Sequence, residues 1–400
     1  MMRKFIILMM VSIASFSCDL LSNEDSEKIE KTLNPRSMAY LASWHYESPA
    51  LNDSIHQIPT EEIEWQAITS LNYFGLTFYK DGSLIPISDY QDMRGIEGQM
   101  SEIVAAAHHH QVPVLLSVGG WQSRENFIAA VRDSSSQKNL ISNLMILLKT
   151  YEFDGIDLNV EPVKPEDEEL YEIFVDELYS NLQTIDTPLF DTPMLTATTI
   201  WQSDLFARIH GKLDHINLMT YNYSNAWEGW VSWHNSAIYN GGHKFVSMDK
   251  YLPSVNSDVE RYIKAGVPRK KLSIGIKFYG DIWTGGVYEP LQEWTSTITP
   301  EVQVDVPYYS IMDSLFNSDY YRWDEEVKAA FLSIDNPGLL NDQFISFEEE
   351  KAIEAKIEYV KEMGLGGVFV WELSGGYQPD QPEGQKNPLQ AAIKKVLLQN

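Results

Sequence analysis

The 400-residue chain has little cysteine, little positive charge and, beyond its first residues, no long apolar run. Cys18 is its only cysteine, which excludes a disulfide within the chain. Lys and Arg number 30 against 57 Asp and Glu, and the net charge of −27 argues against nucleic acid as a partner, because attraction to phosphate needs clustered basic residues. No segment after residue 17 is long and apolar enough to span a bilayer. The hydrophobic fraction of 44% is ample for a large globular core, and neutral substrates remain open.

The first 18 residues predict export. Residues 1–4 carry two positive charges, residues 5–17 form an apolar run of signal-peptide length, and Cys18 follows directly. This arrangement resembles the lipobox of bacterial lipoproteins, in which the cysteine is acylated and becomes the mature N-terminus. Ser15 stands where an aliphatic residue is usual, so plain secretion is the alternative. We expect residues 19–36 to form a tether, with the lipid as the only membrane contact.

From residue 37 onward the chain repeats one pattern: a short β-rich apolar run, a polar loop and a helical segment with apolar residues every three to four positions. Eight such runs within one chain of this length predict an α/β fold, a closed (β/α)8 TIM barrel over residues 37–400, with a doubly wound open sheet as the alternative. The runs are 38–44, 68–78, 112–120, 153–161, 194–200, 215–223, 271–280 and 366–373.

The interval between the seventh and eighth runs departs from this pattern. Residues 281–365 are far more than one loop and one helix, and the first part of this interval has β character. Residues 347–363, "FEEEKAIEAKIEYVKEM", form an amphipathic helical pattern that leads into the eighth run. We therefore expect a small α+β insertion at about residues 281–345 on the catalytic face. An irregular loop is the alternative.

The stretch "FDGIDLNVEP", residues 153–162, carries polar groups inside a buried run. Side chains alternate along a strand, so Asp157, Asn159 and Glu161 face the barrel lumen together. Burying carboxylates is costly, and Glu161 stands at the C-terminal end of its strand, where barrel enzymes place catalytic groups. A buried ion pair is the alternative for Glu161, but no Lys or Arg lies among its strand neighbours. Asp154 has the opposite parity, and we expect it to support the entry of the strand.

Three consecutive histidines, residues 108–110, raise the question of a metal site. Three adjacent side chains cannot all face one ion, and a helix C-terminus favours cationic side chains, which is the simpler explanation. We expect no metal and no cofactor.

Several motifs carry a resemblance to a known family. "DGIDLNVE" closely resembles the Asp-x-x-Asp-x-Asp-x-Glu signature of glycoside hydrolase family 18, the chitinases and endo-β-N-acetylglucosaminidases. Other segments agree in order: "LLSVGGW", "LMTYNY", "WHNSAIY", "LSIGIKFYG" and "GGVFVWELSGG". The resemblance spans residues 37 to 390, and several ordered motifs are far more specific than any single one.

The resemblance implies substrate-assisted hydrolysis. Glu161 would protonate the glycosidic oxygen while the 2-acetamido carbonyl of the substrate attacks the anomeric carbon, with retention of configuration. Asp157 would share a proton or hydrogen bond with position 159, and Tyr221 would donate its hydroxyl to the acetamido oxygen. Trp371 would form the apolar floor under the sugar. Without the motifs, Tyr221 and Trp371 would be read as ordinary core aromatics.

The remaining residues that the resemblance suggests are of two kinds. For three residues of the third run we expect a structural role, because glycine permits close backbone approach at the strand end; they are Ser117, Gly119 and Gly120. Weaker candidates for the substrate-binding mouth are Tyr40, Met219, Asn222 and Trp227.

Two positions depart from the family pattern. Asn159 and Asn222 stand where the family has Asp, so a charge is lost at each while an acceptor oxygen is kept. The sequence predicts a glycosidase that cleaves β-1,4 bonds after N-acetylglucosamine in chitin or chito-oligosaccharides, with an endo-β-N-acetylglucosaminidase or a weakly active glycan-binding relative as the alternative. Chitin, the chitobiose core of an N-glycan and peptidoglycan all remain open as ligands, bound by what we expect to be a monomer.

Overall fold

The computed structural model describes residues 35–45, 57–87, 93–295, 297–336 and 341–398. Cys18, the predicted signal peptide and nearly all of the predicted tether lie outside these residues. The first strand begins at Arg36, one residue before the predicted start of the barrel. No helix in the described ranges has the length and apolar character needed to cross a bilayer.

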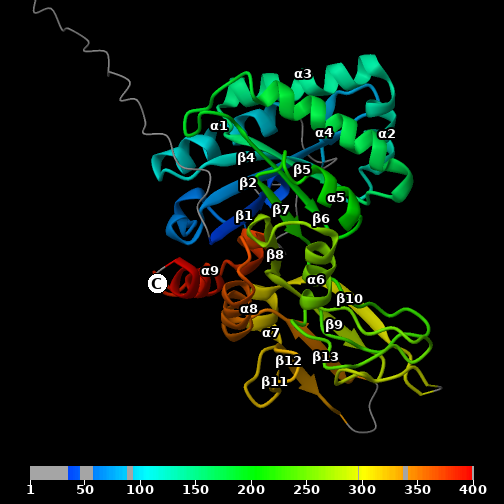
Figure 1. The fold of residues 1–400 in the computed structure, drawn as a ribbon. Coiled ribbons are helices and arrows are strands. Elements are labelled where there is room, and N and C mark those ends of the chain that lie inside the picture. Colours follow the sequence, from blue (N-terminus) through cyan, green and yellow to red (C-terminus); the bar gives the residue numbers. More distant parts are fainter. Residues whose placement is uncertain (1–34, 46–56, 88–92, 296, 337–340, 399–400) are drawn as a thin grey trace, which may run out of the picture.

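Eight parallel strands close into a barrel (Figure 1). The eighth strand pairs with the first, and the first also pairs with the second, so the ring of eight parallel strands is closed. The predicted TIM barrel is confirmed, and the open sheet is wrong. The strands are β1 Arg36–Ala42, β2 Ser70–Phe78, β4 Val114–Gly120, β5 Gly155–Val160, β6 Met194–Thr199, β7 His215–Leu218, β8 Leu272–Lys277 and β14 Gly367–Trp371. A short strand, β3 Leu84–Pro86, pairs antiparallel with the end of β2.

Helices cover the outside of the barrel and bury the outward-facing side chains of its strands. Ile156, Leu158 and Val160 of β5 belong to this outer core, as the alternation predicts. Asp133 caps one helix by accepting hydrogen bonds from the backbone N–H groups of Ser135 (3.1 Å) and Ser136 (2.8 Å). The helices are α1 Met93–His109, α2 Arg124–Arg132, α3 Ser134–Tyr151, α4 Glu168–Leu182, α5 Ser203–Ile209, α6 Val255–Ala265, α8 Glu350–Met363 and α9 Pro388–Ile393.

The interval between β8 and β14 folds into a separate antiparallel sheet, seen in yellow and orange in Figure 1. Its strand order is β10-β9-β13-β12-β11, and it has a small core around Trp283, Val287 and Phe344. The predicted α+β insertion is confirmed, with strands that begin at Tyr279 and end at Phe347. The elements are β9 Tyr279–Thr284, β10 Glu301–Pro307, α7 Tyr308–Ser314, β11 Tyr321–Asp324, β12 Ala329–Ile334 and β13 Gln343–Phe347.

A single residue, Phe278, separates β8 of the barrel from β9 of the insertion. The insertion therefore starts at the C-terminal end of β8, which is the end of the barrel where active sites lie in this architecture. Side chains from β9 and β10 can thus reach the mouth of the barrel.

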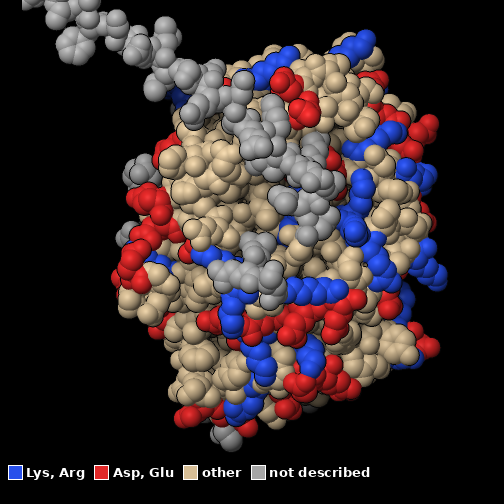
Figure 2. All heavy atoms as spheres, turned by 60° about the vertical axis from the view of Figure 1, so that its left-hand side comes forward, with Lys and Arg blue, Asp and Glu red and all other residues tan. Residues whose placement is uncertain are grey.

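The surface mixes charges of both signs. Figure 2 shows one face, on which Lys and Arg lie interspersed with Asp and Glu. Lys395 and Glu354 form one such exposed pair, 2.7 Å apart. Exposed pairs of this kind contribute little to stability.

Candidate active site

The lumen beneath the mouth is organised around the carboxylate of Asp157. The strand register places Ser117 of β4 and Thr196 of β6 directly beside it. Both hydroxyls donate to the carboxylate, at 2.8 and 2.6 Å, and the Tyr40 hydroxyl of β1 donates at 2.7 Å. Burial raises the pKa of Asp157, and these hydrogen bonds oppose the rise. The expected bond between Asp157 and position 159 is absent among these described residues, because the neighbouring hydroxyls occupy the carboxylate instead.

Glu161 follows β5 directly and lies partly buried at the mouth of the barrel. Burial raises its pKa to about 7, and a side-chain hydrogen bond with Asn159 opposes the rise. The carboxylate can only accept, so Asn159 turns its amide nitrogen towards Glu161. The Asn159 oxygen is buried and has no hydrogen-bond partner in the described structure. The pair therefore combines an acid that is protonated in a substantial fraction of molecules near neutral pH with an unused acceptor.

Tyr221 lies just beyond the end of β7, with its ring against β8 and β14. The ring centroid is 6.0 Å from that of Phe369, and a Cβ at Gly275 would lie 2.5 Å from the ring. Gly275 is thus the residue that makes room for the tyrosine. Burial, followed by the charge of Glu161, raises the pKa of Tyr221 well above its usual range, so its hydroxyl remains a donor.

An aromatic cluster fills the lumen next to these polar groups. Trp371, at the end of β14, packs its ring 5.5 Å from Tyr40 and 5.6 Å from Phe74. Tyr221 and Met219 pack against the same cluster, so the structure brings four of the predicted residues together. Sequence reasoning missed the other members that bound this floor, although they are aromatic or apolar residues in or near lumen-facing strands: Met38, Trp44, Phe74, Ile87 and Phe369.

Gly119 and Gly120 end β4 beside the site. A Cβ at Gly119, where φ is +123°, would lie 2.2 Å from the backbone oxygen of Asn159. At Gly120 a Cβ would meet the ring of Phe74 at 2.7 Å. The two glycines let β4 and the aromatic floor approach Asn159 closely.

The family model described as "Glycosyl hydrolases family 18" matches residues 36–376. The chain belongs to family 18 of the glycosyl hydrolases. It is 28% identical over 304 residues to chitinase A1 of Niallia circulans, covering 70% of this chain and 42% of that protein. It is 27% identical over 307 residues to a probable endochitinase of Caenorhabditis elegans, covering 72% of this chain and 48% of that protein. The chain thus spans about half the length of these curated relatives.

A solved family structure shows the same fold. Catalytic domain 2 of the group II chitinase of Ostrinia furnacalis, in complex with (NAG)5, superimposes with a TM-score of 0.73 at 21% identity. The match covers 90% of this chain and 96% of that one, so the barrel and its insertion form one architecture in both.

Asn222, the second departure from the family 18 pattern, is exposed and has a left-handed backbone conformation, with φ of +58°. Its oxygen accepts from the ammonium of Lys277, the last residue of β8, which is completely buried. Lys277 also contacts Asp281 at 3.4 Å and Asp305 at 2.7 Å. Sequence reasoning missed Lys277, Asp281 and Asp305. A Lys at the C-terminal end of a barrel strand could have indicated this cluster, because active-site residues lie at that end.

Two indoles are exposed near the ends of barrel strands. Trp227 is 47% exposed on the loop after β7, and its ring lies 4.5 Å from that of Trp230 rather than in the cluster around Trp371. Trp121 follows β4 directly and is 68% exposed; sequence reasoning missed it as a candidate site residue. Exposed indoles of this kind offer flat apolar faces to a ligand.

Asp154 lies at the opposite end of β5 from Glu161. It accepts a hydrogen bond from the Val114 backbone N–H at 3.0 Å and contacts Nε2 of His108 at 2.7 Å. It thereby links α1, β4 and β5 away from the catalytic mouth. His110 stacks on Trp65 instead, with ring centroids 5.3 Å apart, so the consecutive histidines serve different partners.

Proposed function

We propose that the protein is a retaining family 18 glycosidase that hydrolyses β-1,4 bonds after N-acetylglucosamine in chitin or chito-oligosaccharides. The observation that carries the proposal is the state of Glu161. It stands at the C-terminal end of a barrel strand, with its pKa raised to about 7 by burial, beside Asn159 and within the electrostatic influence of Tyr221. A carboxyl group tuned to this range is suited to give and take a proton near neutral pH.

In the first step, the acetamido group of the substrate acts as the nucleophile within the same sugar. Glu161 gives its proton to the glycosidic oxygen as the bond from that oxygen to the anomeric carbon breaks, and the acetamido oxygen forms a new bond to the anomeric carbon. Tyr221 donates its hydroxyl to the acetamido oxygen and aims it. Asn159 accepts the acetamido N–H with the oxygen that lacks a partner in the free protein.

The second step returns the proton. The Glu161 carboxylate takes a proton from water, and the resulting hydroxide attacks the anomeric carbon, which breaks the bond to the acetamido oxygen. Two displacements at the same carbon leave the product with the configuration of the substrate. No second protein carboxylate is needed as a nucleophile, since the substrate supplies that group.

Aromatic groups hold the sugar chain in place. Trp371 presents its indole face at the mouth and is fixed from below by Tyr40 and Phe74. Trp121 and Trp227 are exposed indoles on the segments that follow the C-terminal ends of β4 and β7. Sugar rings stack on such faces through their C–H groups, and more than one exposed indole suits a polymer better than a single sugar.

Asn159 favours a second candidate. An amide orients the acetamido group but adds no negative charge to the cationic intermediate, so hydrolysis of chitin would be slowed. An endo-β-N-acetylglucosaminidase acting on N-glycans, or a glycan-binding protein with weak turnover, would tolerate this amide.

One experiment separates these candidates. Release of reducing ends is measured on chitotetraose, on an N-glycan with its chitobiose core and on a peptidoglycan strand, alongside a binding titration with each. The main proposal predicts turnover on chitotetraose with the β-anomer as the first product by NMR. Turnover confined to the N-glycan supports the endoglycosidase, and tight binding without turnover supports the binding protein.

The N-terminal segment bears on the cellular location of the protein. We propose that Cys18 carries a lipid that tethers the exported barrel to the bacterial membrane or cell surface. The motif in the sequence is the support for this, since residues 1–34 lie outside the described structure.

A further inference from the structure

Lys277 is a buried cation at the mouth of the barrel that the mechanism above does not use. Its side chain is completely buried at the end of β8, and its ammonium contacts Asn222, Asp281 and Asp305. A buried ammonium is tolerated only where acceptors surround it. Two carboxylates face one ammonium here, so the cluster as a whole is acidic.

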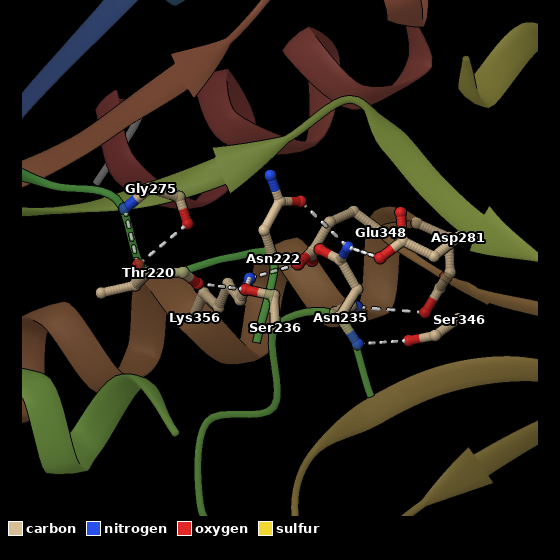
Figure 3. Close-up of polar contacts among 11 residues, drawn as sticks. Thr220, Asn222, Asn235, Ser236, Gly275, Asp281, Ser346, Glu348 and Lys356 are labelled. Carbon is tan, nitrogen blue, oxygen red and sulfur yellow. Dashed lines mark hydrogen bonds and ion pairs between the residues drawn. The ribbon is translucent and has the colours of Figure 1, made fainter. Parts of the chain in front are cut away.

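This cluster fixes which atom Asn222 presents to the mouth. An ammonium can only donate, so the Asn222 oxygen must face Lys277. Asn235 also donates its amide nitrogen to that oxygen, at 3.4 Å, and to the carboxylate of Asp281. Figure 3 shows the resulting orientation, with the Asn222 oxygen on the side of these partners and its nitrogen pointing away. The orientation of the amide therefore follows from its partners, and the exposed atom of Asn222 is an N–H donor.

Asp305 comes to the same place from the insertion. It lies at an irregularity in β10, between Gln303 and Val306, and its φ is +59°. Its backbone N–H donates to Asp281 at 3.2 Å and one carboxylate oxygen contacts Lys277, while 56% of the side chain remains exposed. The insertion thus delivers a fixed, accessible acceptor to the end of the barrel.

Asn222 links this cluster to Tyr221. Asn222 directly follows Tyr221 in the chain, and Asp305 contacts the same Lys277 ammonium as Asn222. The charge of Asp305 also adds to the rise in the pKa of Tyr221, after burial and the charge of Glu161. One buried ammonium therefore holds a donor and an acceptor at the edge of the proposed catalytic position.

We propose that Asn222 and Asp305, both held by Lys277, form a donor–acceptor pair that binds a hydroxyl group of a neutral sugar and disfavours an acidic sugar at the same position. A hydroxyl is both donor and acceptor, so it can give its proton to Asp305 and accept from the Asn222 amide. A carboxylate on the sugar has no proton to give and is repelled by the acidic cluster. This inference rests on the proposed function and narrows it to neutral glycans, such as chitin or an N-glycan core, over strands that carry muramic acid.

Lys277 acts here as a positioning residue, because it is buried beneath the two groups that face the ligand. A purely structural role for the cluster would join the insertion to the barrel and affect stability alone. The preference between neutral and acidic sugars is a readout that such a role would leave unchanged.

The test uses binding to the full chain with Glu161→Gln, so that no ligand is consumed. Calorimetric titrations compare chitotetraose with a tetrasaccharide of alternating N-acetylglucosamine and N-acetylmuramic acid. The first variant adds Asp305→Asn to this background, and because the Asp305 side chain is exposed, the substitution should not disturb folding. The matched control is Glu301→Gln, which changes an exposed carboxylate on the same strand. Asn222→Asp is the second variant, since it keeps an acceptor for Lys277 and replaces the outward donor with an acceptor.

We expect chitotetraose to bind more tightly than the acidic tetrasaccharide. Asp305→Asn should weaken the binding of chitotetraose about tenfold, as expected for loss of a hydrogen bond to a charged group, and should reduce the preference for the neutral ligand. Asn222→Asp should weaken the binding of chitotetraose and weaken the binding of the acidic tetrasaccharide still further. Glu301→Gln should leave both affinities unchanged.

Unchanged affinity and preference in both variants would overturn the inference while leaving the proposed function intact. Equal affinity of the parent for both ligands would overturn it as well. Absence of binding to any glycan, together with absence of turnover in the wild type, would instead mean that the proposed function fails, and the inference with it.

Discussion

Ser117 on β4 lies directly opposite Asp157 on β5, and its hydroxyl donates a hydrogen bond of 2.8 Å to the Asp157 carboxylate. This contact joins two motifs that are 40 residues apart in the chain. Together with Tyr40 and Thr196 it holds Asp157 in the lumen, two alternations before Glu161, which directly follows β5. The strand that carries the proposed catalytic acid is therefore anchored by a polar network rather than by apolar packing alone.

The pKa of Glu161 predicts a pH profile. Catalysis needs the protonated acid, and burial raises its pKa to about 7, so kcat/KM should be constant at mildly acidic pH and fall as the pH rises through about 7. Initial rates on a chito-oligosaccharide between pH 5 and pH 9 give this limb directly. A rate that rises through this range would show that Glu161 does not act as the acid.

Tyr221→Phe tests the donor to the acetamido oxygen. The ring packing against Gly275 and Phe369 is kept, so the variant should fold, while kcat falls about 10²- to 10³-fold because one stabilising donor is lost. Tyr251→Phe removes the same hydroxyl from an exposed tyrosine and serves as the control. Equal rates for the two variants would remove Tyr221 from the mechanism.

Asn159→Asp tests the effect of the negative charge that the family pattern has at position 159 and this chain lacks. A carboxylate beside the cationic intermediate should raise turnover of chito-oligosaccharides, by no more than the roughly 10²- to 10³-fold effect of one electrostatic contact. The added negative charge also favours protonated Glu161, so the alkaline limb should move to higher pH. Turnover is compared on a chito-oligosaccharide and on an N-glycan. A variant slower on both would mark Asn159 as an adapted residue, with no charge deficit at this position.

Much of the barrel and its acid could be predicted because both depend on local alternation. The shared parity of Asp157, Asn159 and Glu161 predicts that all three side chains point to the same side of the strand, towards the lumen. The hydroxyl partners of Asp157 could not be predicted, because they depend on the register between β4, β5 and β6. Strand ends were also uncertain: β7 stops at Leu218, whereas its apolar pattern runs on to residue 223.

The acidic cluster around Lys277 was missed for a different reason. Asp305 reaches it through an irregular strand of the insertion, and no local pattern foretells that contact. The sequence position of Lys277 could have indicated this cluster. Lys277 lies two residues after Gly275 on β8, so both face the same side of the strand, and Gly275 lies against Tyr221 in the lumen. A charged residue at a lumen-facing strand end indicates a functional site at position 277, as it does at position 161.

Cys18→Ala tests the proposed lipid anchor. If Cys18 is acylated, the wild type should fractionate with membranes and incorporate a labelled fatty acid, whereas the variant should lose the label and leave the membrane fraction. Ser17→Ala keeps a small residue before the cysteine and should behave as the wild type. Wild type and Cys18→Ala recovered equally in the soluble fraction would argue for plain secretion.

The most direct measurement of the central claim is the activity and sugar affinity of Glu161→Gln. The substitution removes the transferable proton and keeps the shape, so hydrolysis of chitotetraose should fall about 10²- to 10⁴-fold while the dissociation constant stays close to that of the wild type. Glu169→Gln, an exposed carboxylate on α4, should change neither quantity. Hydrolysis by Glu161→Gln within about tenfold of the wild-type rate would contradict the account, because an acid that supplies the proton cannot be removed at so small a cost.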